Sequence, residues 1–203
     1  MKYSFISPDT PLVLASASPR RKDLLDQVRI PFIAAPADID EDSEEGSPIE
    51  ICRSLAQKKA VHISGEKGSR WILGADTIVV KDGMVMGKPL NKDEAGLMLK
   101  SLSGGPHEVI TGFSIVDPSG NVRVCDHVST TVRVKKLDQS EIHAYIETGE
   151  PFGKAGGYGI QGIGAFMIEA IEGSYSNVVG LPLFAVIESL KRIKALKTFP
   201  ETP

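Results

Sequence analysis

Apolar runs and capped helix starts interleave along this chain, and this alternation limits its possible folds more than any other feature. The runs typical of strands occupy residues 12–15, 31–35, 71–80, 107–116, 122–134 and 165–171. Helices are expected to begin at Ser18-Pro19, Ser47-Pro48, Asn91, Asp138 and near Leu181, because Ser, Asn and Asp cap helix N-termini and Pro suits the first turn. Strands and helices alternate without a strict βαβ repeat. The sequence therefore predicts a mixed α/β fold, a mixed twisted sheet flanked by helices.

Composition narrows the functional classes. The 203 residues suit one domain over 1–203, of one or two lobes, with a flexible tail at 197–203. A net charge of −3 argues against a nucleic-acid partner, since binding a phosphate backbone needs a basic excess. No segment resembles a signal peptide or a membrane span, so we expect a cytoplasmic protein. Cys52 and Cys125 show no metal-binding spacing, which favours core thiols.

A first candidate site follows the strand at 12–15, where a Ser-rich turn leads into a helix carrying two arginines. Ser16 and Ser18 lie in the turn, and Arg20 and Arg21 lie in the first helical turn. Free N–H groups at a helix start attract anions, and guanidinium groups bind phosphate oxygens in a planar, bidentate manner. The segment is compatible with a phosphate site or with a solvated basic patch.

Two charged residues lie in apolar surroundings. Asp76 interrupts the run at 71–80, where a carboxylate is costly unless it is paired or bound to a metal. Such a group could act as a general base, or it could cap a turn at a strand end. Lys59 follows Leu55 by four residues and Ala56 by three, so it belongs to the apolar face of its helix. It either extends past the core or points into a cleft at an anion.

Other polar segments allow both a structural and a functional interpretation. Lys88 alone would be an ordinary surface lysine, and the acidic stretch at 38–42, which contains Glu41, could be a solvated loop or could help to hold Mg²⁺. The glycine-rich stretch at 153–164 indicates special backbone dihedrals or close approach to a ligand. Within it, Lys154 supplies a cation and Gln161 could bond to a base edge, although a flexible turn would look the same. Ser174, Ser176 and Asn177 could be turn residues or phosphate donors, and we favour a turn.

In order, these segments resemble the Maf family of nucleoside triphosphate pyrophosphatases, in its dTTP/UTP pyrophosphatase branch. The matching stretches are LASASPRR at 14–21, DIDE at 38–41, LAQKKA at 55–60, GADT at 74–77, GKP at 87–89, SG with HEV within 103–109, YGIQG at 158–162, and 173–182. These stretches are spread from residue 14 to residue 182, which is nearly the whole length of the chain. One departure is Gly153, where many members have Asp.

The resemblance implies a fold like that of inosine triphosphatases, with two lobes around a deep cleft, and a homodimer. It implies a divalent metal, Mg²⁺ or Mn²⁺, and hydrolysis of dTTP and UTP, or of modified pyrimidine nucleotides, to the monophosphate and pyrophosphate. By the same match, Asp76 is the proton acceptor, and Glu41, Lys59 and Lys88 line the cleft. Arg20, Thr77 and Gln161 fall at positions linked to substrate choice.

Combining both lines gives a mechanistic hypothesis. The Ser16–Ser18 turn, Arg20, Arg21, Lys88 and Lys154 hold the triphosphate, Asp76 or Glu41 holds the metal, and Asp76 deprotonates the water that attacks the α-phosphorus. Two alternatives remain open. One is a 7-methyl-GTP pyrophosphatase, and the other is a non-catalytic nucleotide-binding regulator of cell division.

Overall fold

The computed structural model describes residues 3–40, 44–66 and 69–200. Its seven-stranded sheet has the order β2-β1-β3-β5-β6-β7, with β4 paired to β3. β1 runs parallel to β2 and β3, whereas β4 is antiparallel to β3 and β7 to β6. The strands are β1 Leu12–Leu14, β2 Phe32–Ala34, β3 Ile72–Lys81, β4 Met84–Met86, β5 Pro106–Val116, β6 Val122–Val134 and β7 Ile168–Glu172. The predicted mixed sheet is thus confirmed.

Six α-helices and two 3-10 helices accompany the sheet in the described part of the chain. They are α1 Pro19–Gln27, α2 Pro48–Glu66, α3 Lys92–Leu102, α4 Gln139–Glu147, α5 Tyr175–Val179, α6 Leu183–Arg192, η1 Ala155–Gly157 and η2 Ile163–Met167. None of the helices in the described ranges is both long and apolar enough to cross a membrane.

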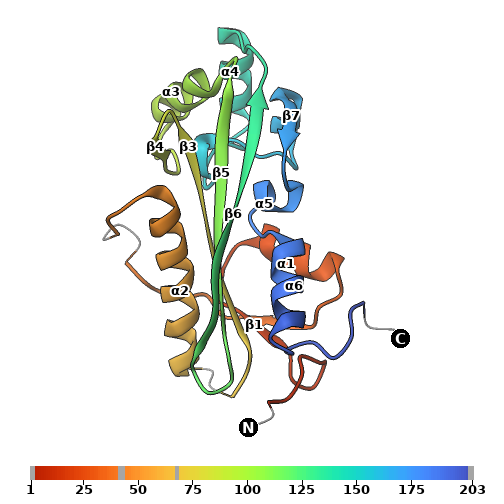
Figure 1. Ribbon diagram of the computed structural model, residues 1–203. Helices are drawn as coiled ribbons and strands as arrows, with labels where there is room; N and C mark the ends of the chain where they lie inside the picture. The colour runs from red at the N-terminus through yellow and green to blue at the C-terminus, as the bar shows by residue number, and fades with distance from the viewer. Residues whose placement is uncertain (1–2, 41–43, 67–68, 201–203) are drawn as a thin grey trace. The chain divides into compact units, whose positions relative to one another are not determined.

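The chain divides into two compact units. Unit 1 comprises Met1–Asp76, Thr111–Val128 and Gly180–Pro203, and unit 2 comprises Thr77–Ile110 and Ser129–Val179. In unit 1, α2 lies against one face of the strands and α1 and α6 against the other (Figure 1). Apolar side chains of α2 pack against those of the strands it covers, and this cluster includes Val13, Ile63 and Ile72. In unit 2 the core includes Leu99, Tyr145 and Tyr158.

Local capping signals predicted most helix starts correctly. Glu50 accepts a hydrogen bond from the Ser47 amide at 2.8 Å, which completes the box that opens α2. Asp138 and Glu141 form the same reciprocal box at the start of α4, whereas Asn91 caps α3 by accepting a hydrogen bond from the Glu94 amide at 2.9 Å. Ser18 occupies the N-cap position of α1, but its side chain makes no capping hydrogen bond.

The glycine-rich region and the segment after β7 differ from the expectation. The strand predicted to begin at Ala165 begins at Ile168, because residues 163–167 form η2 instead. The turn expected around Ser176 is the short helix α5, which Ser174 caps by accepting a hydrogen bond from the Asn177 amide at 3.3 Å. The last helix begins at Leu183, with Pro182 at its N-cap. The flexibility of the tail at 197–203 stays a prediction.

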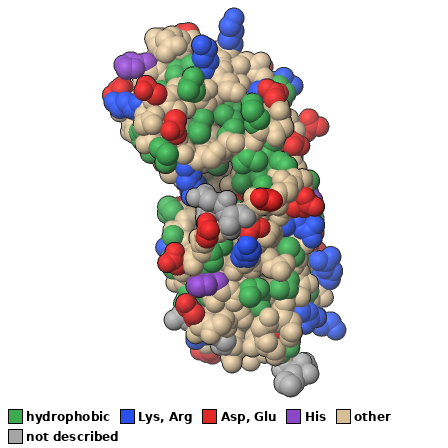
Figure 2. Space-filling view, turned by 90° about the vertical axis from the view of Figure 1, so that its left-hand side faces the viewer, with side chains coloured by type: hydrophobic (Ala, Val, Ile, Leu, Met, Phe, Trp, Pro, Cys, Tyr) green, Lys and Arg blue, Asp and Glu red, His purple; other side chains and the backbone are tan. Residues whose placement is uncertain are grey.

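Charged side chains of both signs are spread over the face of the molecule that Figure 2 shows. The space-filling view shows Lys and Arg intermixed with Asp and Glu, with hydrophobic side chains between them (Figure 2). This distribution on the face in view accords with the small net charge of −3.

Candidate active site

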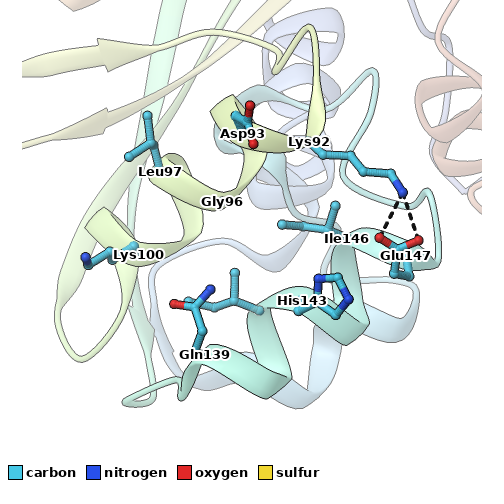
Figure 3. Close-up of a pocket in the computed structure, with 10 residues that line it drawn as sticks. Lys92, Asp93, Gly96, Leu97, Lys100, Gln139, His143, Ile146 and Glu147 are labelled. Carbon is cyan, nitrogen blue, oxygen red and sulfur yellow. Dashed lines mark hydrogen bonds and ion pairs between the residues drawn. The ribbon is translucent and has the colours of Figure 1, made fainter.

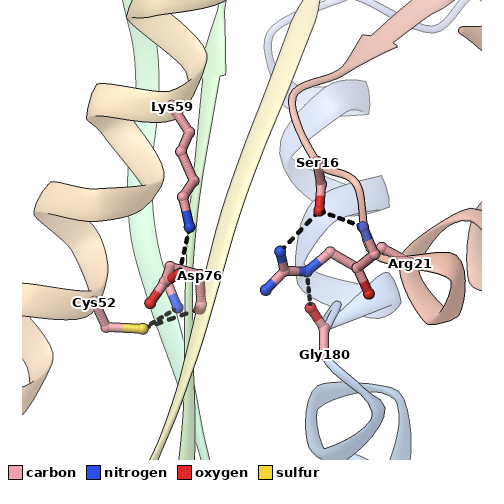
Figure 4. Close-up of polar contacts among 8 residues, drawn as sticks. Ser16, Arg21, Cys52, Lys59, Asp76 and Gly180 are labelled. Atoms are coloured by element: carbon pink, nitrogen blue, oxygen red, sulfur yellow. Dashed lines mark hydrogen bonds and ion pairs between the residues drawn. The ribbon is translucent and has the colours of Figure 1, made fainter. Parts of the chain in front are cut away.

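The centre of the candidate site is an ion pair inside unit 1. Lys59 reaches from α2 to Asp76 on β3, and its Nζ lies 2.6 Å from Asp76 Oδ1 (Figure 4). The two side chains are 9% and 11% exposed. Each charge lies on a buried face, as the sequence indicated, and the structure adds that each has the other as a partner. A buried charge pair is retained at a desolvation cost, which suits a functional role.

Two glycines permit the close approach of α2 that makes this pair possible. A Cβ atom on Gly74 would overlap the carbonyl oxygen of Ala56 and would lie 2.8 Å from the Ala60 amide nitrogen. A Cβ atom on Gly112 of β5 would overlap the carbonyl group of Cys52. The helix backbone therefore lies directly on β3 and β5, which brings the Lys59 side chain within reach of Asp76.

Cys52 lies two helical turns before Lys59 on the same face of α2, and it holds the backbone of Asp76 in place. Its Sγ donates to the Asp76 carbonyl oxygen at 3.0 Å and accepts from the Gly112 amide at 2.9 Å. Burial first, and the Asp76 charge second, raise the pKa of Cys52 to about 12, while Arg21 and Lys59 act in the opposite direction. The thiol is therefore neutral at physiological pH, and it connects β3, β5 and α2 as a structural group.

The predicted phosphate turn is also ordered within unit 1. Arg21 is 9% exposed; its Nε donates to the Gly180 carbonyl at 2.8 Å and its Nη1 to Ser16 Oγ at 3.0 Å (Figure 4). The Ser18 amide also donates to Ser16 Oγ, at 3.2 Å. Arg21 thus anchors the turn to the start of the C-terminal segment. Arg20 is only half-buried, and burial lowers its pKa from the ordinary value of a guanidinium group. Phosphate binding by this turn stays a prediction.

The other predicted site residues fall in unit 2 or outside the described residues. Thr77, Lys88, Lys154 and Gln161 belong to unit 2, where Lys88 and Gln161 are exposed and Lys154 Nζ donates to the Glu150 carbonyl at 2.5 Å. Glu41 lies outside the described residues. That the residues of both units line one cleft stays a prediction.

A pocket in unit 2 is lined by residues of two helices. Its volume is about 530 Å³, and its lining residues come from α3 and α4 (Figure 3). Lys92 Nζ and Glu147 form an ion pair at 2.8 Å across its edge. The residues around this pocket include no predicted site residue, so we assign the chemistry to the Asp76 region.

The donor set fits a metal that arrives with a polyphosphate rather than a metal cage made of protein side chains. Within the described ranges, no group of three or more His, Cys, Asp or Glu side chains could hold an ion. Mg²⁺ prefers oxygen ligands, keeps several waters and is commonly bound by one or two carboxylates plus substrate phosphates. The buried carboxylate of Asp76 meets that requirement.

Comparison with known proteins agrees with this chemistry. Residues 11–193 match the family model described as Maf-like protein, so the chain belongs to the Maf family. The dTTP/UTP pyrophosphatase of Syntrophotalea carbinolica is 50% identical over 194 residues, which cover 94% of this chain and 88% of that protein. The dTTP/UTP pyrophosphatase of Ruminiclostridium cellulolyticum is 46% identical over 184 residues, covering 90% and 95%.

Among solved structures, the chain is similar to a nucleoside-triphosphatase / dITP/XTP pyrophosphatase from Mycobacterium abscessus. The likeness covers 91% of this chain and 96% of that one, at 14% identity and a TM-score of 0.43.

Proposed function

We propose that this chain is a nucleoside triphosphate pyrophosphatase that hydrolyses dTTP and UTP to the monophosphate and pyrophosphate. The observation that carries the proposal is the buried pair of Lys59 and Asp76, 2.6 Å apart. Relatives that are 46–50% identical over most of the chain are named dTTP/UTP pyrophosphatases. A carboxylate oriented in this manner by an ammonium group suits proton transfer.

Asp76 accepts the proton of the attacking water in this proposal. Lys59 donates to Oδ1, which fixes the orientation of the carboxylate and compensates its charge in a buried position. A base that is positioned in advance contributes through orientation as well as through basicity. Lys59 is therefore a positioning residue for Asp76.

The turn after β1 binds the phosphates in the same proposal. Arg21 keeps Ser16 in place, so that the start of α1 presents its backbone amides and Arg20 to a polyanion. In this proposal Lys88 and Lys154 supply positive charge that attracts the triphosphate. Thr77 and Gln161 contribute to the choice of base.

Mg²⁺ or Mn²⁺, bound with the triphosphate, would offset negative charge on the phosphate oxygens. Asp76 and Glu41 are the residues that would hold it. The same proposal places the protein in the cytoplasm as a homodimer. Exposed apolar side chains in unit 2, such as Met84, Leu90 and Leu97, offer surface for subunit contact.

The deciding experiment measures pyrophosphate release from a nucleotide panel, with Mg²⁺, with Mn²⁺ and with EDTA. The panel contains dTTP, UTP, CTP, dATP, GTP, 5-methyl-UTP and 7-methyl-GTP. We expect metal-dependent turnover with dTTP and UTP preferred over the purines. A preference for 7-methyl-GTP would contradict the substrate assignment. Binding of dTTP with Mg²⁺ but no pyrophosphate release would indicate a nucleotide-binding regulator instead.

A further inference from the structure

Several donors converge on the carboxylate of Glu150, which follows α4 in unit 2. Oε2 accepts from the Ile163 amide at 2.8 Å, and Oε1 accepts from the Gly164 amide at 2.9 Å. Oε1 also accepts from the Tyr145 hydroxyl at 2.9 Å. Both backbone donors lie just after Gln161, so one side chain fixes the downstream end of the segment that carries it.

The upstream end of the same segment is tied to Glu150 through Tyr145. Tyr145 Oη donates to Glu150 and accepts from the Gly159 amide at 3.1 Å. Residues 159 and 163 are therefore both held, two positions before and two positions after Gln161. Between these two fixed points the Gln161 side chain is exposed.

The backbone of the segment lies directly on the carboxylate. A Cβ atom on Gly162 would overlap Glu150 Oε2, and a Cβ atom on Gly164 would lie 2.7 Å from Tyr145 Oη. Two glycines of the stretch that alone was compatible with a flexible turn, Gly162 and Gly164, are thus explained by close packing on Glu150 and Tyr145.

The charge of Glu150 makes these contacts strong. Burial would raise its pKa, but hydrogen bonds from Gly164, Ile163 and Tyr145 and the charge of Lys154 hold the pKa below its ordinary value. The group is therefore an ionised acceptor at neutral pH, and hydrogen bonds to a charged acceptor are about twice as strong as neutral ones. Lys154 Nζ also donates to the Glu150 carbonyl at 2.5 Å, so the predicted cation of the segment is held by the same residue.

We propose that Glu150 is a positioning residue that holds the 159–164 segment, and with it Gln161, in the geometry that binds the pyrimidine base. This inference rests on the proposed function. A held segment presents the amide of Gln161 without the entropy cost of ordering a loop when substrate binds. A free segment would pay that cost for every substrate, which weakens binding and reduces discrimination between bases.

The test compares wild type, Glu150→Gln, Glu150→Ala and, as a matched control, Glu147→Gln. Glu147 is the last residue of α4, three positions before Glu150, and it pairs with Lys92 instead. Steady-state kinetics with dTTP, UTP and dATP give kcat and KM separately. Hydrogen exchange of a peptide covering 156–168 reports the segment independently of activity.

For Glu150→Ala we expect faster exchange of this peptide and a KM for dTTP raised ~10–100-fold, the effect of losing one or two charge-assisted hydrogen bonds. kcat should fall less than about threefold, because Asp76 and Lys59 are held by contacts within unit 1. The ratio of kcat/KM for dTTP to kcat/KM for dATP should decrease. Glu150→Gln, which keeps one acceptor oxygen, should give an intermediate KM, and Glu147→Gln should match wild type.

A purely structural role would lower kcat through loss of folded protein and leave KM unchanged, and that result would overturn the proposal. Unchanged exchange in Glu150→Ala would do the same. If Glu150→Ala does not fold, Glu150→Gln decides between the two results. If wild type releases no pyrophosphate, the proposed function fails, and the exchange measurement still decides whether Glu150 holds the segment.

Discussion

Lys59 Nζ and Asp76 Oδ1 lie 2.6 Å apart, in a pair whose side chains are about nine-tenths buried. The pair joins α2 to β3, and Cys52 on the same helix bonds to the Asp76 backbone. Two side chains from one helix thus hold Asp76: Cys52 fixes its backbone, and Lys59 compensates the charge of its carboxylate. This arrangement leads to separate predictions for chemistry and for stability.

Replacing Asp76 by Asn removes the base and keeps the shape of the side chain. We expect kcat for dTTP to fall by ~10²–10⁴, the range for loss of a general base. The measurement is initial-rate pyrophosphate release, with thermal melting to confirm that the variant folds. Asp126→Asn is the control, since Asp126 is an exposed carboxylate on β6. A turnover of Asp76→Asn within a few-fold of wild type would show that another group takes the proton.

Replacing Lys59 by Met leaves the carboxylate buried without its ammonium partner. The free energy of unfolding should fall by about 3–5 kcal/mol, as when one member of a buried pair is removed. Denaturant titration measures this, and the double variant with Asp76→Asn should recover part of the loss. Lys58→Met is the control, because Lys58 is the neighbouring residue and its side chain is 52% exposed. Equal stability of the two Lys variants would contradict the proposed coupling.

Replacing Gly74 by Ala inserts a methyl group where the α2 backbone lies against β3. The helix must shift, so we expect a stability loss of about 1–3 kcal/mol, typical of overpacking, together with reduced turnover as Lys59 moves away from Asp76. Gly65→Ala is the control: Gly65 lies in α2, and no atom of the described residues lies within 4 Å of an added Cβ. It should gain up to about 1 kcal/mol from helix propensity. If both variants unfold alike, the close approach is not required.

Local patterns were sufficient for the longer helices and for the burial of Lys59 and Asp76. The spacing of Lys59 from Leu55 and Ala56 placed its charge on the buried face, and the apolar run around Asp76 placed that carboxylate inside. Helical spacing could also have joined Cys52 to them, since residues seven apart share a face. The family motifs were confirmed by the Maf match over 11–193.

What the sequence did not predict depends on contacts between distant segments. η2 forms where a strand was expected because the Glu150 carboxylate accepts hydrogen bonds from the Ile163 and Gly164 amides. No local sequence pattern indicates a partner that lies thirteen residues away. The role of Arg21 is similar: its Gly180 partner is 159 residues away. The sequence pointed to an anion site there, while the structure shows that Arg21 also orders the turn.

The pH dependence of stability should report a buried histidine in unit 2. Burial, and to a lesser extent the Lys81 charge, lower the pKa of His107 from 6.5 to about 4. Its Nε2 lies 2.7 Å from Tyr158 Oη, and its buried Nδ1 has no hydrogen-bond partner among the described residues. Protonation would therefore bury a charged donor without an acceptor. Between pH 6.5 and 4 the unfolded chain binds this proton and the folded chain does not, so stability falls as the pH falls through that window.

Denaturant titrations at pH 7 and pH 5 measure this contribution. From His107 alone we expect a loss on the order of 1–2 kcal/mol at pH 5, since one pKa unit corresponds to about 1.4 kcal/mol. His107→Gln is less stable at pH 7 because it loses the imidazole contact with Tyr158, but its stability should change less between the two pH values. His143→Gln, at an exposed position on α4, should keep the wild-type difference. An equal stability difference between the two pH values in wild type and His107→Gln would mean that His107 takes up its proton over the same pH range in the folded and the unfolded protein. The contact with Tyr158 would then not depend on a neutral ring.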